Sequence, residues 1–580
     1  MSPILGGGSG QKGSTATLDQ VTAAVMRAKF DALLGEMSVT LQNSSRSRRI
    51  SVQRQFGCAL LDLDGEVIAC DNPRHLPTIR DTARSFTEEF AFDLAVDDVI
   101  VANDPLLGGI SVHYMTMLAP FGIGEDIHGY LVVQAHTSDV GGITFGNYDP
   151  AAVEMRAEGL RYTPLRLVRY GRMRRDLLDT VLLNGREPET FRHDLDAMLA
   201  CLAVGRRRST ELIEDYGVQS VQIAFSSVLD YSERLMRRAL EALPEGDYSG
   251  ECIVEDDFHG RTDLTVRVKI SKKDDEVLLD FTETDEQSSG FINSTPSNTE
   301  ACALMSLLPL IDDSVPRNGG LLRPLAFKTA PGTLTEVRRP APTGLSTDHV
   351  GHEIAEAVRR AIETAVPERT GPSTPSRPLA FTVRKETLVG RVLEQLDMTD
   401  LGVFSQAGAS AGHEVDGWGQ PGPVSLGLMP SIEEIELESD LAFRRLEYRC
   451  DSGGAGRLRG GLGTETVITF PKGSNERLYS CLFDAENASG GLAGGLGGQA
   501  AGIAVRRDGN EVELAGSTAD FSMAEGVEVI VRTPGGAGYG DPQERGAEEV
   551  EQDVEDGFVS PKAAADLYGA KVSSNARSVA

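Results

Sequence analysis

The sequence lacks the features that mark nucleic-acid-binding and membrane-spanning proteins. Its 580 residues include 56 lysines and arginines against 87 acidic residues, which gives a net charge of −31. Nucleic-acid binding depends on clustered basic side chains that displace counterions, so this excess of acid argues against it. No apolar run reaches about 18 residues, the length that a membrane-spanning helix needs. We therefore expect neither a nucleic-acid partner nor a membrane segment.

Cysteine is scarce and shows no metal-binding spacing. The seven cysteines are odd in number, and no two of them form a CxxC pair. This spacing excludes a zinc ribbon and favours buried, reduced thiols. Cys58 lies within an apolar strand pattern, so we expect it to be structural rather than nucleophilic. The first twenty residues contain no apolar core for a signal peptide, and the expected location is the cytoplasm.

Two common catalytic signatures are also missing. There is no GxSxG nucleophile elbow. The glycine-rich segment GGAGRLRGGLG could bind a phosphate through backbone N–H groups, but it lacks the lysine and Ser/Thr of a P-loop. A set of structural turns is the favoured interpretation, and we expect no ATP site of a known loop type in this chain.

The patterns that are present predict a multidomain α+β protein. Helical spacing of apolar residues covers 17–41 and much of 176–243, strand-like patterns cover 56–70, 97–105 and 127–136, and polar and apolar residues alternate over 262–284. Glycine-dense segments separated by short strands indicate a β-dominated C-terminal part. The predicted regions are a flexible tail at 1–15, an N-terminal α/β region with a helical segment at 16–243, an α+β middle domain at 244–372, a glycine-rich β domain at 373–545 and a helical tail at 546–580.

Two predicted strands end in polar, glycine-paired loops that could form one site. The first loop begins NDPLLGG at Asn103 and leads to His113, and the second is AHTSDVGG, which contains His136 and Asp139. Such loops can meet at one rim of a rigid scaffold and bind a metal or a substrate. A single histidine at a strand end can equally be structural. His349 and His352 lie at a helix start, where capping and solvation are expected.

The order of motifs resembles the hydantoinase B/oxoprolinase family, which also includes a subunit of acetone carboxylase. The matching pieces, in the family's order, are GCALLDLDGEVIA, HLP, NDPLLGG, AHTSDVGG, EGLRYTPLRL, LLNGREPE, PEGDY, INSTPSNT, DSGGAGRLRGGLG and TPGGAGYGDP. The resemblance implies a hydantoinase A-type partner that binds ATP with Mg and phosphorylates a substrate carbonyl. It also implies hydrolysis of a cyclic amide (a hydantoin, 5-oxoproline or a lactam) or carboxylation of a ketone by the complex.

The resemblance further implies a divalent metal in this type of chain, but the sequence departs from that pattern. The family's ligand positions hold Gln55, Ser111 and Tyr114 here, and only His136 matches. A further histidine usual in the family is Ile79. Because three or more good ligands are normal for a divalent ion, bound metal in this chain is doubtful.

These departures favour carboxylation of a ketone, as in acetone or acetophenone carboxylase, over hydrolysis. Hydrolysis at neutral pH needs an activated water, which a metal supplies, whereas carboxylation of an enol phosphate needs a dry pocket with oxyanion partners. The alternatives are cyclic-amide hydrolysis and a non-catalytic scaffold subunit with a decayed metal site. The predicted catalytic residues are His136 as acid, base or oxyanion donor, Asp139 as its orienting group, and His113. The predicted substrate-binding residues are Asn103, Asp104, Gly108, Gly109, Ser111 and Tyr114.

Overall fold

The computed structural model describes most of residues 19–570. The segments outside the description are 1–18, 91–92, 138, 144–148, 150, 371–379, 390–391, 404–406, 421–423, 425–427, 429–430, 440, 471–475, 482–489, 515–517, 523–526 and 571–580. The expected tail at 1–15 and the expected boundary near 373 lie outside the described residues. No described helix is long and apolar enough to cross a membrane.

The N-terminal part is built on a seven-stranded sheet of order β2-β1-β5-β4-β3-β6-β7. Its strands are β1 (Phe56–Leu61), β2 (Val67–Cys70), β3 (Val99–Ala102), β4 (Tyr114–Ile123), β5 (Asp126–His136), β6 (Leu165–Arg169) and β7 (Arg172–Met173). The antiparallel hairpin β1–β2 confirms the turn expected at Asp64 and Gly65. Every residue of β1 is buried, as is nearly all of β4, because both faces of the sheet are covered.

Helices cover the two faces of this sheet. One face packs on the long helices α1, α6 and α7, which share one apolar core with residues such as Leu60 and Met117. The opposite face packs on α3 (Leu76–Glu89) and on α8 (Pro296–Leu307) from the middle part, where Ile79 and Leu304 belong to a second core. The helices of this part are α1 (Gln20–Ser44), α2 (Arg48–Ser51), α3 (Leu76–Glu89), α4 (Met155–Glu158), α5 (Arg175–Leu183), α6 (Pro188–Tyr216) and α7 (Val218–Leu240), with short 3-10 turns η1 (Pro73–His75) and η2 (Pro105–Leu107).

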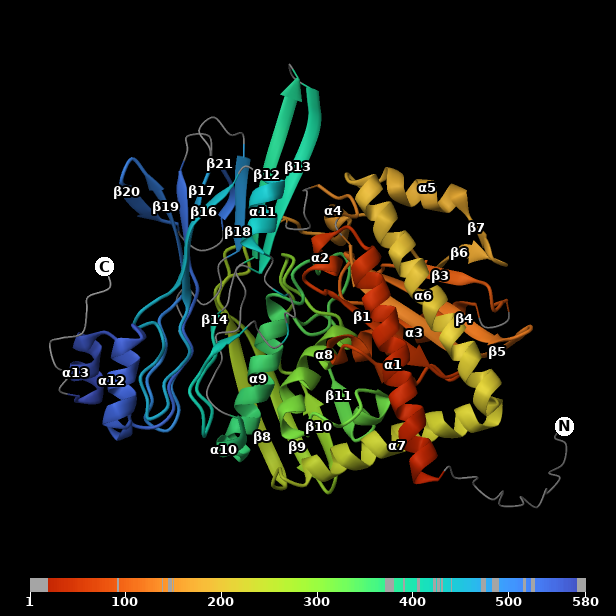
Figure 1. The fold of residues 1–580 in the computed structure, drawn as a ribbon, viewed down its shortest axis with the longest axis horizontal. Helices are drawn as coiled ribbons and strands as arrows, with labels where there is room; N and C mark the ends of the chain where they lie inside the picture. The colour runs from red at the N-terminus through yellow and green to blue at the C-terminus, as the bar shows by residue number, and fades with distance from the viewer. Residues whose placement is uncertain are drawn as a thin grey trace.

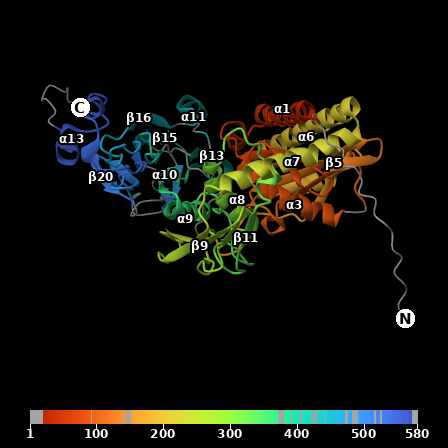
Figure 2. The same ribbon diagram turned by 90° about the horizontal axis from the view of Figure 1, so that it is seen from below.

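The middle part is a four-stranded sheet backed by helices. The strand order is β11-β10-β9-β8, and β10 and β11 run parallel whereas the other pairs are antiparallel. Its elements are β8 (Gly246–Val254), β9 (Leu264–Lys273), β10 (Glu276–Asp280), β11 (Leu325–Lys328), α8 (Pro296–Leu307), α9 (Val350–Ala365) and α10 (Pro367–Thr370). In Figure 1 this green part lies below the C-terminal strands and beside the red N-terminal helices, and Figure 2 shows it between the other two parts.

The C-terminal part contains two larger sheets, of orders β13-β12-β18-β21 and β16-β17-β22-β19-β20, and the pair β14–β15. The β12–β13 hairpin projects beyond the body of the molecule in Figure 1. The elements are β12 (Ala380–Val389), β13 (Val392–Val403), β14 (Ala407–Gly408), β15 (Gly419–Gln420), α11 (Ile432–Glu438), β16 (Ala442–Tyr448), β17 (Thr464–Thr469), β18 (Glu476–Cys481), β19 (Gly502–Arg507), β20 (Asn510–Glu513), β21 (Thr518–Ser522), β22 (Glu528–Arg532), α12 (Ala547–Glu555) and α13 (Pro561–Tyr568).

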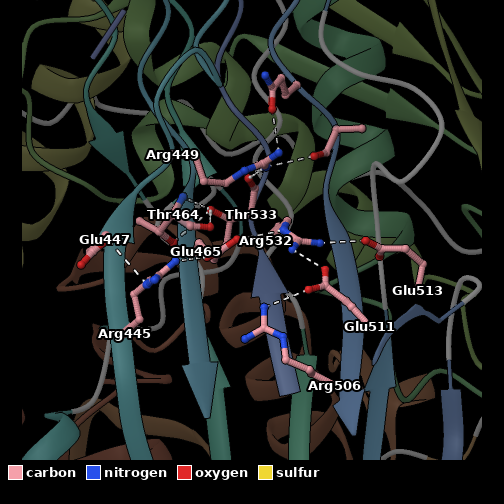
Figure 3. Close-up of polar contacts among 12 residues, drawn as sticks. Arg445, Glu447, Arg449, Thr464, Glu465, Arg506, Glu511, Glu513, Arg532 and Thr533 are labelled. Atoms are coloured by element: carbon pink, nitrogen blue, oxygen red, sulfur yellow. Dashed lines mark hydrogen bonds and ion pairs between the residues drawn. The ribbon is translucent and has the colours of Figure 1, made fainter. Parts of the chain in front are cut away.

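One face of the five-stranded sheet bears a cross-strand network of ion pairs (Figure 3). Arg532 on β22 bonds Glu465 on β17 at 3.0 Å and Glu511 and Glu513 on β20 at 2.6 and 2.7 Å. Arg445 on β16 extends the network through Glu465 at 2.9 Å. The alternation of charges on neighbouring strands holds the register of the sheet on its polar face, while its other face forms an apolar core.

The glycine-rich segments pack against one another through their backbones. A Cβ atom added at Gly460 would lie 2.0 Å from the Gly536 carbonyl oxygen, and one at Gly536 would lie 2.0 Å from the Ala409 carbonyl oxygen. Only glycine permits backbones to approach so closely. This packing supports the interpretation of GGAGRLRGGLG as a structural element rather than a phosphate loop.

The α+β multidomain class expected from the sequence is confirmed, and the cysteine expectation needs one correction. Cys58 is buried within β1, at 3.7 Å from the Cys201 sulfur, as a structural thiol should be. Cys450 is exposed, contrary to the expectation that the thiols are buried, because it lies just after β16, whose last residues also face solvent.

Candidate functional site

The predicted site residues lie at one edge of the N-terminal sheet. Tyr114 begins β4 and is paired in register with His136, the last residue of β5. Gln55 directly precedes Phe56, which begins β1 and pairs with Ala135 of β5. Because neighbouring antiparallel strands begin and end at the same edge of a sheet, three segments distant in sequence bring their side chains together here.

Four aromatic rings form a continuous row at this edge. The ring centroids are 5.6 Å apart for His75 and Tyr114, 4.9 Å for Tyr114 and His136, and 5.8 Å for His136 and His113. The last pair is stacked, with an interplanar angle of 21°. The structure therefore brings together His113 and His136, as the two loops predicted, and adds His75 from η1.

His136 is held as a neutral imidazole with one fixed tautomer. Its Nδ1 lies 2.8 Å from the Thr137 carbonyl oxygen, which can only accept, so Nδ1 carries the hydrogen and donates it. Burial, and then the positive charge of Arg49, hold the pKa of His136 well below its usual range. Its Nε2 is therefore a hydrogen-bond acceptor at neutral pH. This geometry fits a hydrogen-bond acceptor and does not fit the expected role of oxyanion donor.

His113 is fully buried and also neutral. Neither ring nitrogen has a hydrogen-bond partner among the described residues. Burial and the nearby Arg49 lower its pKa to about 3. The Arg49 side chain is buried as well, and its Nη1 lies 3.3 Å from the Gln55 Oε1. A fixed guanidinium thus lies beside both imidazoles and opposes their protonation.

The other wall of the site comes from the middle part. Arg74, in η1, donates from Nη2 to Asn298 Oδ1 at 2.9 Å and to Thr347 Oγ1 at 2.8 Å. Thr347 also hydrogen-bonds the Tyr114 hydroxyl, and burial raises the pKa of Tyr114 to about 12, so this group is a neutral phenol. A small pocket is lined by residues that include Gln55, Arg74, His75, Tyr114, Thr347 and Asp348.

Asp139 does not orient His136, which corrects the sequence-based assignment. Its Oδ1 accepts the backbone N–H groups of Gly141 and Arg186 at 2.8 and 3.0 Å. Its Oδ2 lies 3.3 Å from Arg186 Nη1. The orienting partner of His136 is instead the Thr137 carbonyl, because the chain turns after β5 and directs the Asp139 carboxylate towards the segment that follows α5.

The polar residues of NDPLLGG shape the loop rather than the pocket wall. Asn103 is buried and bonds backbone groups of neighbouring segments, including the Val112 carbonyl at 2.8 Å. Asp104 forms ion pairs with Arg161 at 3.4 Å and with Arg339 at 3.2 Å. The polar atoms of both side chains bond other groups of the protein, so their geometry does not support the substrate contacts expected of them.

The glycines and the serine of this stretch are also structural. Gly108 has a φ of 101°, and a Cβ there would lie 2.6 Å from the Cβ of Asp81. The Gly109 carbonyl accepts from Thr295 Oγ1 at 2.6 Å, which joins the loop to the middle part. Ser111 is buried and does not line the pocket. Tyr114 is the member of the predicted substrate-binding set that does.

His349 and His352 are buried, which overturns the expectation of capping and solvation. They are 1% and 2% exposed, and the N-terminus of α9 has no side-chain cap from His349. His349 Nδ1 lies 2.7 Å from Glu353 Oε1, and its Nε2 lies 2.9 Å from the Asp256 carbonyl. The start of α9 is covered by α8 and by the segment before β9, so the two rings pack in the interior.

The residues present do not fit the metal that the resemblance implies. Gln55, Ser111 and Tyr114 replace anionic or imidazole ligands by neutral oxygen groups, and the Tyr114 phenol resists ionisation because its pKa is raised. The Arg49 charge beside His113 and His136 would further oppose a cation. Within the described part of the chain, no three His, Cys, Asp or Glu side chains are grouped as metal ligands.

Sequence reasoning missed the two arginines and Asp348. Arg74 precedes the HLP motif, and Asp348 precedes His349, so both are next to residues that the sequence had singled out. Arg49 lies in a basic run that has no distinctive spacing. One feature of the sequence pointed to the arginines, namely the loss of three metal ligands. When a site loses a metal ion, a nearby basic side chain can replace its positive charge.

Comparison with known proteins gives similarity along nearly the whole chain. The family model described as hydantoinase B/oxoprolinase matches residues 19–542. The chain is 31% identical to the beta subunit of the caprolactamase of Pseudomonas jessenii, over 96% of this chain and 97% of that one. It is 26% identical to the B subunit of a putative D-/L-hydantoinase from a Pseudomonas species, over 96% and 95% of the two chains.

Two solved structures share the fold. The crystal structure of the ATP-dependent caprolactamase from Pseudomonas jessenii superposes with a TM-score of 0.88 at 30% identity, covering 97% of this chain and 98% of that one. The nucleotide-free acetone carboxylase structure superposes with a TM-score of 0.84 at 16% identity, covering 95% and 79%. The similarity to acetone carboxylase is one of fold. The family model and the caprolactamase subunit match this sequence along nearly its whole length, so this chain belongs to the hydantoinase B/oxoprolinase family.

Proposed function

We propose that this chain is the B-type subunit of an ATP-dependent complex in which a hydantoinase A-type partner binds ATP and phosphorylates a carbonyl compound. We further propose that the complex carboxylates a ketone without a metal-activated water. The main supporting observation is the set of side chains in the site at the edge of the N-terminal sheet. Neutral imidazoles, a phenol and two buried guanidiniums lie at or beside the positions that the resemblance assigns to metal ligands.

The chemistry of these groups favours carboxylation. In carboxylation the enol carbon attacks carbon dioxide, and the developing carboxylate needs hydrogen-bond donors in a water-poor site. Arg74 and the Tyr114 hydroxyl are such donors, and both are buried. Hydrolysis needs a base or a metal to activate water, and His136 has a pKa too low to be an effective base at neutral pH.

Cyclic-amide hydrolysis is the second candidate, and a specific observation favours it. The beta subunit of caprolactamase is similar to this chain over nearly its whole length, whereas the acetone carboxylase is similar in fold. In this chemistry the partner's phosphorylation would make the amide a stronger electrophile, and the Nε2 of His136 would accept a hydrogen bond from the attacking water.

The test is co-expression with the A-type partner and measurement of ATP turnover. One arm supplies ketones with bicarbonate, and the other supplies hydantoins and lactams, with metal content measured on the same sample. Bicarbonate-dependent turnover of a ketone supports the proposal, and turnover of a ring amide supports the second candidate. If neither arm turns over, both proposed reactions fail and a non-catalytic scaffold is favoured; if one arm is active but His136→Ala leaves its rate unchanged, the role of His136 fails.

A further inference from the structure

Arg74 is a buried cation that lacks an ion pair within the described residues. Its side chain is 2% exposed, and its Nη2 is the nitrogen that has partners, Asn298 and Thr347. Both partners are neutral, so neither balances the positive charge. The Nε and Nη1 atoms are buried and have no acceptor in the described part of the chain. Three of the five N–H groups of this guanidinium are therefore unused.

A buried, incompletely paired guanidinium is costly, and proteins rarely retain one without a use. Burying a charge is unfavourable unless it is paired and hydrogen-bonded. The location argues that the missing partner is a ligand, because Arg74 lines the same pocket as Gln55, His75 and Tyr114. The pocket lies between the N-terminal sheet and the start of α9, and its lining comes from both parts of the protein.

The charged side chains that line the pocket are Arg74 and Asp348, and Arg49 lies nearby. The positive charges of Arg74 and Arg49 lower the pKa of the Tyr114 hydroxyl, and the negative charge of Asp348 raises it. His75 is neutral, because burial and the adjacent Arg74 lower its pKa to about 3. Of the charged groups that act on the Tyr114 hydroxyl, two are guanidiniums and one is a carboxylate, so an anion beside this hydroxyl would meet more positive than negative charge.

We propose that Arg74 binds a small oxyanion in this pocket, through the N–H groups of Nε and Nη1. Guanidinium groups recognise carboxylate and phosphate oxygens through several parallel N–H bonds, and the Tyr114 hydroxyl adds a donor on the same wall. The free volume of the pocket is about 10 Å³, room for about one water, so an oxyanion reaches Arg74 only when the side chains that line the pocket move apart. If the proposed function holds, this anion is the carboxyl donor or the phosphoryl group, so its role in turnover rests on that function. The binding of the anion to Arg74 does not depend on it.

The two sources of an oxyanion are distinguished by calorimetric titration of the full chain, without ATP or the partner subunit. The probes are sodium bicarbonate, sodium acetate and sodium phosphate at constant ionic strength, with sodium chloride as the blank. We expect one saturable site in the wild type. Tighter binding of bicarbonate or acetate assigns a carboxylate-type ligand, and tighter binding of phosphate assigns a phosphoryl group.

The decisive variant is Arg74→Gln, which removes the charge and keeps a polar side chain. We expect its affinity for the preferred anion to fall at least about tenfold. Arg323→Gln is the matched control, since Arg323 bonds Asp230 at 2.9 Å and does not line the pocket; its affinity should be unchanged. If Arg74→Gln does not fold, Arg74→Lys keeps the charge with fewer donors and should bind more weakly than the wild type.

Two outcomes would overturn the inference. One is the absence of saturable binding of all three anions by the folded wild-type chain. The other is equal affinity in the wild type, the Arg74 variant and the Arg323 control. Because the titration uses neither ATP nor a ketone, a failed carboxylation assay leaves a positive binding result intact. Conversely, active carboxylation without any anion binding at Arg74 would reject this site and leave the proposed function standing.

Discussion

His113 and His136 are stacked with their ring centroids 5.8 Å apart, directly before β4 and at the end of β5. Two imidazoles so close could share a metal or a proton, but here both are neutral and lie beside the Arg49 guanidinium. Of the two rings, His136 has a nitrogen that is hydrogen-bonded within the described residues, and His113 has none. The pair is therefore asymmetric, and the two histidines should respond differently to substitution.

Replacement of His136 should abolish most of the activity of the complex. We expect His136→Ala to lower the turnover of whichever substrate is active by roughly 10²- to 10⁴-fold, since the acceptor nitrogen at the reacting centre is lost. The control is His193→Ala on α6, far along the chain from the site, which should retain wild-type turnover. Steady-state ATP hydrolysis coupled to substrate measures both. Equal activity of the two variants would contradict a catalytic role for His136.

Acid should destabilise the protein through His113. Its pKa is about 3 in the folded chain against 6.5 for an unperturbed histidine, so the unfolded state binds the extra proton between these values. The free energy of unfolding should therefore fall as the pH drops from 6.5 towards 3, by at most about 5 kcal/mol for this group. His113→Leu, which leaves no unpaired ring nitrogen, should reduce this dependence in urea unfolding at a series of pH values. An unchanged pH dependence in the variant would reject the assignment.

Glu158 should act in the opposite direction at higher pH. Burial raises its pKa to about 8 although the backbone N–H groups of Thr343 and Gly344 donate to it. The folded chain then holds a proton that the unfolded chain has released between pH 4.5 and 8, so stability should decrease as the pH rises through this range. We expect Glu158→Gln to be stable without this decrease. Thermal unfolding of both proteins at about pH 5 and about pH 8 measures the difference, and parallel losses would show that another group is responsible.

Restoring the family's ligands should restore a metal site. The triple substitution Gln55→Asp, Ser111→His and Tyr114→Asp would place two carboxylates and an imidazole next to His136. Because four such ligands suit a divalent ion, we expect about one equivalent of zinc to remain after loading and desalting. The same variant with His136→Ala should retain less. If the triple variant binds no more metal than the wild type, these positions do not form a ligand set in this chain.

The glycine packing should be intolerant of a methyl group. Gly460→Ala and Gly536→Ala each direct a Cβ to 2.0 Å from a carbonyl oxygen, so the backbones must separate. We expect each to destabilise the protein by roughly 1–3 kcal/mol. Gly490→Ala is the matched control, because nothing lies within 4 Å of its added Cβ. Urea unfolding with a constant m-value compares the three; a stable Gly460 variant would contradict the close approach of these backbones.

The local structure of the chain follows from its sequence, as particular elements illustrate. The apolar spacing at 17–41 predicts α1, and the Asp19 side chain caps its first N–H groups. Asp64 and Gly65 predict the turn between β1 and β2, and the apolar run ending at His136 predicts β5. These features depend on residues close together in the chain, so periodicity and turn residues suffice to predict them.

The identity of the lost ligands was also determined by the sequence, because the order of motifs assigns Gln55, Ser111 and Tyr114 to their positions. Only the tertiary structure decided what surrounds them. Arg74 meets Thr347 across a separation of 273 residues, and no local pattern encodes such a contact. Likewise, α8 and the segment before β9 bury His349, which its own helix would leave exposed. Burial and long-range pairing set the charge states of this site, and both arise when the N-terminal sheet and the middle part pack together.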